Sequence, residues 1–210
     1  MEFEITSKRL YDAAVEDSVS TLTSLIQQDP LILDRIISLT SFIETPLHIS
    51  VLHGHLEFTW ALLSHNPHLV NEADSLGPLP LHVAATHGPV EIICELLRLE
   101  PGTCLARDKD GKTPLHLAIM KGGRVEVVQE LITRACPKSI RLSLDRGETI
   151  LHLCVKYDNL QALNMSVEDL ELRGENDNNN LLNARADDGN TIIHLAAARK
   201  HLEVRTFSNL

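Results

Sequence analysis

The stretch from Asp108 to Ile132, DKDGKTPLHLAIMKGGRVEVVQELI, is the feature that most constrains the fold. A turn signal leads into Thr113-Pro114, and proline suits the first turn of a helix, because its φ is already helical and no N–H is needed there. Apolar residues then recur at helical spacing, Gly122-Gly123 ends this short helix, and a second apolar stripe follows. Such a turn–helix–turn–helix unit cannot bury its apolar stripes alone, so it requires neighbouring copies of itself.

The copies are marked by a histidine that stands between two apolar residues. It recurs at intervals of 34, 34, 36 and 42 residues, at His48, His82, His116, His152 and His194. Glycine stands five residues before the last four of these motif histidines and six residues after the first three. In the copies that contain His48, His82 and His116, the second helix is expected to end at Pro67, Pro101 and Pro137, respectively. Residues Lys8 to Asp29 form a first, degenerate copy in which Tyr11 takes the histidine position.

The repeated T-P-L-H-x-A unit, with a period of about 33 residues, resembles the ankyrin repeat. This resemblance covers nearly the whole chain. It implies an all-α solenoid of stacked helix-turn-helix units with short β-hairpin tips. We expect one ankyrin array over residues 1–204, with about six repeats, of which the first is degenerate and the last incomplete. A polar, Asn-rich stretch near 173–180 is expected to be a mobile loop, and 205–210 an unstructured tail.

Two segments carry a closer resemblance. ETILHLCVKY, from Glu148, and DDGNTIIHLA, from Asp187, are similar to plant ankyrin-repeat proteins with a C-terminal PGG domain, a group similar to the accelerated-cell-death proteins. In that group the ankyrin array precedes membrane helices and serves defence or stress signalling. The PGG and membrane part is missing from this sequence, and the repeat pattern dissolves after Val204. We therefore expect a truncated or alternatively ended member of a longer family.

Composition argues against several classes of function. Hydrophobic residues make up 43% of the chain and aromatic residues only 3%, so the core must be built from aliphatic side chains. A net charge of −10 offers no general electrostatic footprint for nucleic acid, and no nucleic-acid partner is expected. No run of 18 apolar residues and no signal peptide are found. We therefore predict no membrane span and a cytoplasmic location, peripheral to a membrane only through full-length, membrane-anchored relatives.

No group of residues indicates catalysis, a cofactor or a metal. Nucleophile elbows and phosphate-binding loops are lacking, and paired carboxylates such as Asp108 and Asp110 stand in turns, where they stabilise the local backbone. His53 and His87 are expected near one another, but no further ligand joins them at zinc spacing. The four cysteines form no C-x-x-C pair and are expected to be reduced thiols. The resemblance implies that the motif histidines are structural and bridge turn backbone and threonine by hydrogen bonds.

The remaining candidate for function is the surface. In ankyrin arrays, partners usually bind the concave face, which is formed by hairpin tips and by the exposed ends of the first helices. Motif position assigns the tips to Ser75, Leu76, Lys109, Asp110, Asp145 and Arg146, and the helix ends to Leu52, His53, Thr86, His87, Met120, Lys121, Lys156 and Tyr157. We call these residues the tip and helix-end row.

This row changes in chemical character from repeat to repeat, as a specific protein groove requires. The sequence therefore predicts a non-catalytic protein–protein interaction scaffold, which binds one or more protein partners in plant defence or stress signalling. The alternative is a truncated regulatory isoform that docks onto full-length, membrane-anchored relatives through its last, incomplete repeat.

Overall fold

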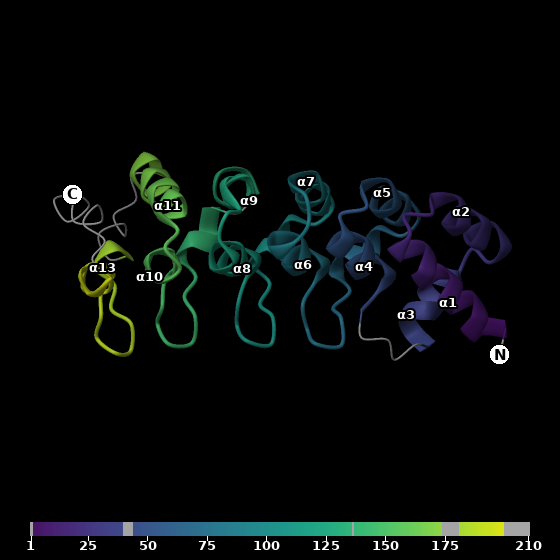
Figure 1. Cartoon of the computed structure of the whole chain (residues 1–210), viewed down its shortest axis with the longest axis horizontal. Helices are drawn as coiled ribbons and strands as arrows, with labels where there is room; N and C mark the ends of the chain where they lie inside the picture. The colour runs from purple at the N-terminus through teal and green to yellow at the C-terminus, as the bar shows by residue number, and fades with distance from the viewer. Residues whose placement is uncertain (1, 40–43, 136, 174–180, 200–210) are drawn as a thin grey trace. The chain divides into compact units, whose positions relative to one another are not determined.

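The structure is a computed structural model that describes residues 2–39, 44–135, 137–173 and 181–199. Over these residues the chain folds into helices and turns without an extended strand, so the expected all-α class is confirmed (Figure 1). The chain divides into two compact units, Met1–Asp110 and Gly111–Leu210. The expected loop near 173–180 lies, from residue 174 on, outside the described residues, and so does the expected tail at 205–210.

The first unit contains three helix pairs, each followed by one further short segment. These are α1 (Glu2–Val15) and α2 (Val19–Gln28) with α3 (Ile32–Leu39), α4 (Pro46–His53) and α5 (Leu56–His65) with the 3₁₀ turn η1 (Pro67–Asn71), and α6 (Pro80–Thr86) and α7 (Val90–Leu99) with the 3₁₀ turn η2 (Pro101–Leu105). The first helices pack in the order α1, α4, α6, and the second helices in the order α2, α5, α7. This unit therefore has two layers of helices.

The second unit, taken by itself, has the same kind of helix pairs. Its elements are α8 (Pro114–Lys121), α9 (Val125–Gln129), the π-helix η3 (Glu130–Ala135), the 3₁₀ turn η4 (Pro137–Arg141), α10 (Ile150–Lys156), α11 (Leu160–Arg173) and α13 (Ile192–Ala198). The first helices α8, α10 and α13 pack in succession, and α11 packs against α9 and η3. The prolines that were expected to close the second helices begin the 3₁₀ turns η1, η2 and η4.

The threonine and histidine of the motif begin α8 and α10 by the same local mechanism. At α8 the hydroxyl of Thr113 accepts a hydrogen bond from the backbone N–H of His116, and the histidine ring accepts one from the backbone N–H of Thr113. The same reciprocal pair joins Thr149 to His152 at α10. Each pair satisfies two backbone donors that a helix start otherwise leaves unbonded. The motif therefore acts as a signal for the start of a helix.

A left-handed residue ends most first helices, six positions after the motif histidine. Gly54 and Gly122 adopt φ of 74° and 71° there. Asp17 and Asp158 occupy the same position after Tyr11 and His152, with φ of 57° and 55°. Aspartate is one of the few side chains that tolerates this conformation. The degenerate first copy and the fifth copy thus keep the turn geometry without its glycine.

The cores of both units are aliphatic, as composition predicted. Residues on the inner faces of the first and second helices are fully buried, among them Leu10, Leu47, Leu62, Leu81 and Leu96 in the first unit and Leu115, Ile119, Val128, Leu151 and Leu163 in the second. Phe58 is an aromatic exception in the core, whereas Trp60 on the same helix is 40% exposed. Burial of these stripes between successive helices is the main stabilising term.

The hairpin tips are shorter than expected. In the first unit the turn before α6 is closed by two backbone bonds, from Asp74 N to Pro78 O at 2.9 Å and from Gly77 N to Asp74 O at 3.0 Å. The turns before α10 and α13 repeat this pair of bonds. Ladder pairing in the described part of the chain is limited to one isolated antiparallel bridge, between Ser143 and Thr149. The tips are therefore hydrogen-bonded turns rather than stranded hairpins.

Candidate interaction surface

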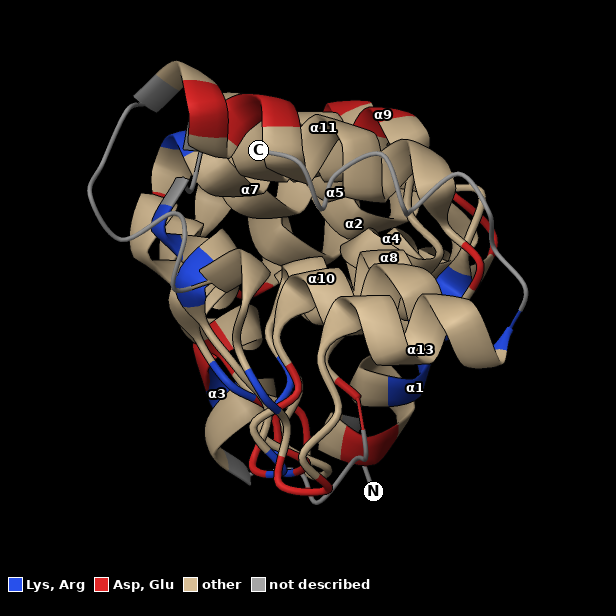
Figure 2. Ribbon diagram, turned by 90° about the vertical axis from the view of Figure 1, so that its left-hand side faces the viewer, with Lys and Arg blue, Asp and Glu red and all other residues tan. Residues whose placement is uncertain are grey.

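The tips of the first unit are exposed and linked to each other. Ser75 and Leu76 form one tip, where Leu76 is 59% exposed, and Lys109 and Asp110 form the next. The Lys109 ammonium donates to the Ser75 carbonyl of the neighbouring turn. The aspartate that begins each turn accepts a backbone N–H, at 2.7 Å for Asp74, so its carboxylate serves the turn itself. Figure 2 shows acidic and basic segments on the turns that precede the first helices, which overlap in that view.

At the helix ends of the first unit, some side chains of the row contact other residues of the chain and others are exposed. Leu52 is 37% exposed and His53 and His87 are exposed, while Thr86 is half-buried and donates its hydroxyl to the Val83 carbonyl at 2.9 Å. The His53 ring stacks on His55, with centroids 5.5 Å apart. Leu52, His53 and His87 are thus the helix-end side chains that this unit offers to solvent.

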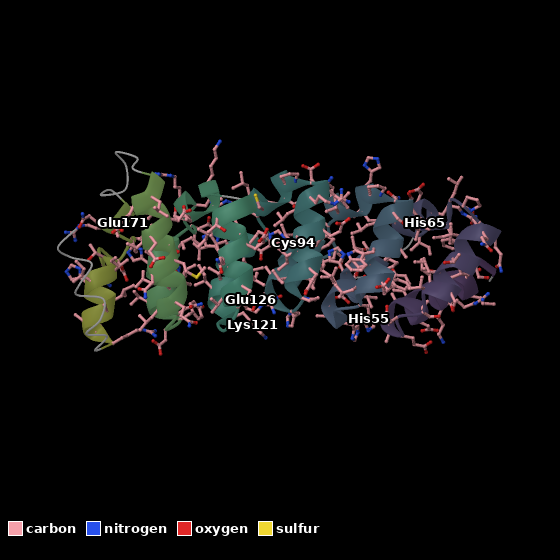
Figure 3. All side chains as sticks on the ribbon, turned by 90° about the horizontal axis from the view of Figure 1, so that it is seen from above. His55, His65, Cys94, Lys121, Glu126 and Glu171 are labelled. Carbon is pink, nitrogen blue, oxygen red and sulfur yellow. The ribbon has the colours of Figure 1, made fainter. Side chains whose placement is uncertain are left out.

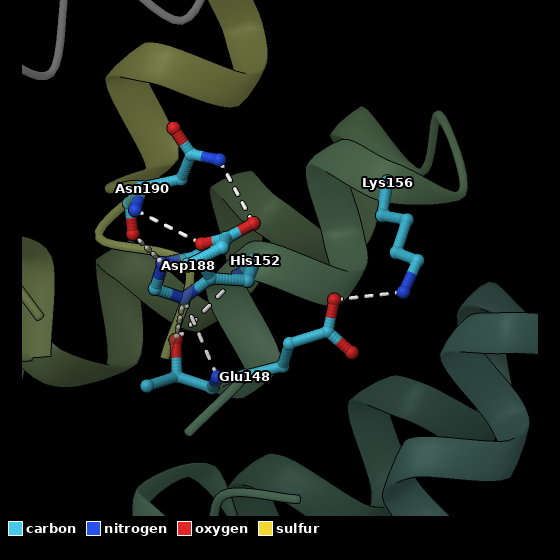
Figure 4. A network of polar contacts seen from close by, with 6 residues as sticks. Glu148, His152, Lys156, Asp188 and Asn190 are labelled. Carbon is cyan, nitrogen blue, oxygen red and sulfur yellow. Dashed lines mark hydrogen bonds and ion pairs between the residues drawn. The ribbon is translucent and has the colours of Figure 1, made fainter. Parts of the chain in front are cut away.

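The row in the second unit offers one unpaired lysine and one paired lysine. Lys156 donates to Glu148 Oε1 at 2.7 Å (Figure 4), whereas Lys121 has no ion-pair partner among the residues that the structure describes. Tyr157 is 39% exposed, and Met120 is half-buried. Both tip residues, Asp145 and Arg146, are exposed. The Arg146 carbonyl accepts the Asp187 N–H of the next tip at 3.0 Å, so these tips are also linked.

Three motif histidines, His48, His82 and His152, donate through Nε2 to a backbone carbonyl further along the chain. His152 Nδ1 accepts from Thr149 N at 3.3 Å, and its Nε2 donates to the Asn190 carbonyl at 3.2 Å (Figure 4). In the first unit His48 Nε2 donates to the Pro78 carbonyl at 3.1 Å. Because a ring nitrogen that accepts a backbone N–H carries no proton, His152 is the neutral Nε2-protonated tautomer.

Tyr11 makes the same contact from the degenerate copy. Its hydroxyl donates to the Glu44 carbonyl at 3.0 Å, and Glu44 stands directly before the threonine that caps the next motif helix. Pro78 and Asn190 stand at the corresponding position. The prediction that Tyr11 occupies the histidine position is confirmed by this bond.

Burial determines the charge state of these histidines. It lowers the pKa of His48 and of His152, and the hydrogen bonds to the carbonyls of Pro78 and Asn190 oppose that shift only in part. The neighbouring Asp188 carboxylate has a lowered pKa because the backbone N–H and side-chain amide of Asn190 donate to it. The two histidines are therefore neutral structural donors near pH 7 rather than available bases.

Among the described residues, the side chains that commonly bind metal ions do not gather into a site. Over the described part of the chain no cluster of three His, Cys, Asp or Glu side chains has the geometry to hold a metal ion. Cys94 and Cys154 are not disulfide-bonded, and burial raises the pKa of the Cys154 thiol to about 12. The expectation of reduced thiols is wrong for Cys104, which is disulfide-bonded, and Cys136 lies outside the described residues. No helix among the described residues is long and apolar enough to cross a membrane.

Sequence reasoning missed one hollow in the first unit. A cavity of about 520 Å³ lies between α3 and the end of α5, with Leu33 and Leu69 at its base. The signal that could have revealed it is LILDRIISL, from Leu31, in which apolar residues recur at helical spacing where the other repeats have only a short turn.

The comparison with known families agrees with this geometry. The family model for ankyrin repeats (3 copies) matches residues 10–105 and 93–169. The chain belongs to the ankyrin-repeat family. Ankyrin repeats are protein-interaction modules, so a role in binding protein partners follows from membership. No curated protein matches the chain.

Proposed function

We propose that this ankyrin-repeat protein is a non-catalytic scaffold that binds a protein partner through the tip and helix-end row. The observation that carries the proposal is a contrast between buried and exposed polar groups. The buried motif histidines are engaged within the scaffold, whereas side chains of the row are exposed and differ from one repeat to the next. A regular backbone that presents irregular side chains suits specific recognition of one protein surface.

Within the row, a few residues are the best candidates for anchors. Tyr157 combines an exposed aromatic ring with a hydroxyl, and such residues are enriched among binding hot spots. Leu76 adds the most exposed apolar side chain of the tips. Lys121 has no intramolecular ion pair to break among the described residues, unlike Lys156, whose bond to Glu148 would compete with a partner. We therefore rank Lys156 below Lys121 as an anchor.

The biological setting belongs to the same proposal. Resemblance of the segments that begin at Glu148 and Asp187 to plant PGG-domain ankyrin proteins supports a role in plant defence or stress signalling, in the cytoplasm. The alternative, a regulatory isoform that docks onto longer relatives, depends on the end of the last repeat. The residues after 199 lie outside the described part of the chain, so no observation favours that alternative.

Partner capture from plant lysate tests the proposal. Wild-type protein is compared with a variant that carries alanine at Lys109, Asp110, Lys121 and Tyr157. The matched control carries alanine at exposed positions of second helices, Glu126 and Asn164. We expect wild type and control to retain the same protein and the row variant to lose it, with equal circular dichroism spectra. Equal retention by all three proteins, or retention by none, would contradict the proposal.

A further inference from the structure

The cavity of the first unit has an apolar base and a polar rim. Leu33 of α3 and Leu69 of η1 are buried beneath it, and Ile26 and Ile37 line its walls half-buried. Its volume of about 520 Å³ falls within the range of small ligand pockets. None of the residues that line it belongs to the tip and helix-end row. The cavity is therefore a second candidate site.

The rim is rich in hydrogen-bond acceptors. Asp34 and Glu72 line it as carboxylates, and no lysine or arginine is among the described residues that line it. Asn66 Nδ2 donates to Asp34 Oδ1 at 2.6 Å, which orients this carboxylate and leaves its second oxygen to accept. His65 Nδ1 lies 2.8 Å from the Ala61 carbonyl and donates to it, so this ring nitrogen is already engaged within the chain. A ligand must therefore bring donors.

The arginine next to Asp34 does not neutralise the rim. Arg35 pairs with Asp29 and lies over the ring of Phe3, 5.3 Å from its centroid. These three residues line a different hollow, on the other side of α3. The Glu72 carboxylate has neither a hydrogen bond nor an ion pair within the described residues. Among the described residues, no lysine or arginine pairs with the carboxylates of the rim.

The charge of the whole chain is concentrated in the same unit. Residues 1–110 contain 16 Asp and Glu against 6 Lys and Arg, which is the entire net charge of −10, while residues 111–210 contain 13 of each. An acidic unit attracts cationic partners and steers their approach. Local acceptors and long-range field therefore favour the same class of ligand.

We infer that this cavity binds a lysine or arginine side chain of a basic segment in a partner protein. The apolar base covers the methylene stem, and the carboxylates of Asp34 and Glu72 accept hydrogen bonds from its charged head. Figure 3 labels His55 and His65 at the two ends of α5, whose 10 residues span about 15 Å, and the cavity lies at the His65 end. The site is a second contact, separate from the row.

Fluorescence anisotropy with a defined peptide tests the inference on the full chain. The probe is a fluorescein-labelled pentapeptide with a central lysine between two leucines, and its partner probe has norleucine in place of lysine. The test variant combines Asp34→Asn with Glu72→Gln, in which the Asn66 bond to position 34 is retained. The control combines Glu57→Gln with Glu91→Gln, two exposed carboxylates of the same unit outside the cavity.

We expect the lysine peptide to bind wild type and control equally. Each lost carboxylate weakens binding about threefold, the size of an exposed ion pair, so the double variant binds about tenfold more weakly. The affinity of the norleucine peptide for wild type is expected to be as low as the affinity of the lysine peptide for the double variant, or lower. In NMR spectra of the protein titrated with the lysine peptide, the amide shift changes are expected at residues 65–72. Four results would overturn the inference. The control variant could lose binding as strongly as the double variant, or the two peptides could bind wild type equally. The amide shifts could be confined to the row, or the lysine peptide could fail to bind at all.

The variant with alanine at Lys109, Asp110, Lys121 and Tyr157 separates this inference from the proposed function. It retains the cavity and is expected to bind the lysine peptide like wild type. Loss of peptide binding in that variant would place the peptide on the row and refute the cavity as its site.

Discussion

Truncation of Leu115 to alanine tests whether the repeat register places the core correctly. Leu115 follows the helix-start proline of α8 and is fully buried. Its counterparts Leu47, Leu81 and Leu151 are equally buried, so the side chain occupies a position that the fold repeats. The substitution removes about three carbon groups at about 0.8 kcal/mol each and leaves a cavity between packed helices. We expect the free energy of unfolding to fall by about 3 kcal/mol.

The control is Leu117→Ala, in the same helix two positions away. Leu117 is only half-buried, so its truncation exposes less new surface and is expected to cost about 1 kcal/mol. Urea unfolding followed by circular dichroism gives the two midpoints. Because the stability of a repeat array is a sum of local and nearest-neighbour terms, amide exchange should accelerate most in α8 and α10. A Leu115→Ala midpoint no lower than that of Leu117→Ala would refute the register.

Three further predictions concern pH, thiol reactivity and turn geometry. Burial lowers the pKa of His48 and His152 below 6.5, so at lower pH the unfolded chain binds more protons than the folded protein. The contribution of these histidines to the free energy of unfolding is therefore full above pH 6.5. Below that pH it falls by up to about 1.4 kcal/mol per pH unit for each histidine. A urea midpoint that stays constant as the pH drops below 6.5 would contradict this. Cys154, whose thiol pKa is raised to about 12, should resist iodoacetamide in the folded protein and react after unfolding, as mass spectrometry of the labelled peptide can show. Gly77→Ala should cost about 1–2 kcal/mol in urea unfolding because φ is +98° there, whereas Gly102→Ala, which lies outside the positive-φ region, should be nearly neutral.

The start and end of the motif helices could be predicted from the sequence because local rules determine both. α8 runs from Pro114 to Lys121 and ends at left-handed Gly122, as the proline and the glycine pair predicted. The segment that became α3 was missed although Ile32, Leu33 and Ile36 are buried at helical spacing. The repeat pattern assigned it to a connection, so the expected register outweighed a clear local periodicity. The cavity was missed with it.

The interval of 36 residues in the fourth copy shows a different limit. Compared with an interval of 34, two residues are additional, and the sequence itself indicates a place for one of them, near Gly123-Arg124. Gly123 indeed follows Gly122 in a left-handed turn, with φ of 63°. The second is absorbed in η3, where Glu130–Ala135 widens into a π-helix. An added residue can be accommodated anywhere along a helix, so the sequence does not reveal where the widening falls.

For the candidate surface, motif position predicts which residues stand at tips and helix ends, and the exposed tips of both units agree with those positions. It cannot predict which long side chains fold back onto the scaffold. Lys156 reaches Glu148, and Lys109 reaches the Ser75 carbonyl, through rotamers that depend on neighbours eight and 34 residues away. These internal bonds change the free energy that each lysine could contribute to a partner, so rank within the row had to come from the structure.

The hydrogen bonds between repeats explain how one scaffold can carry many surfaces. His48 and His152 each bind a cap in their own repeat and a carbonyl in the next, and Tyr11 reaches the equivalent carbonyl with a phenol. The position therefore accepts any donor of the right reach, not one residue type. Because the spacing of adjacent repeats depends on these buried bonds and on the aliphatic core, exposed tip and helix-end residues are free to differ without a change in backbone geometry. Specificity for a partner can then reside in the exposed side chains.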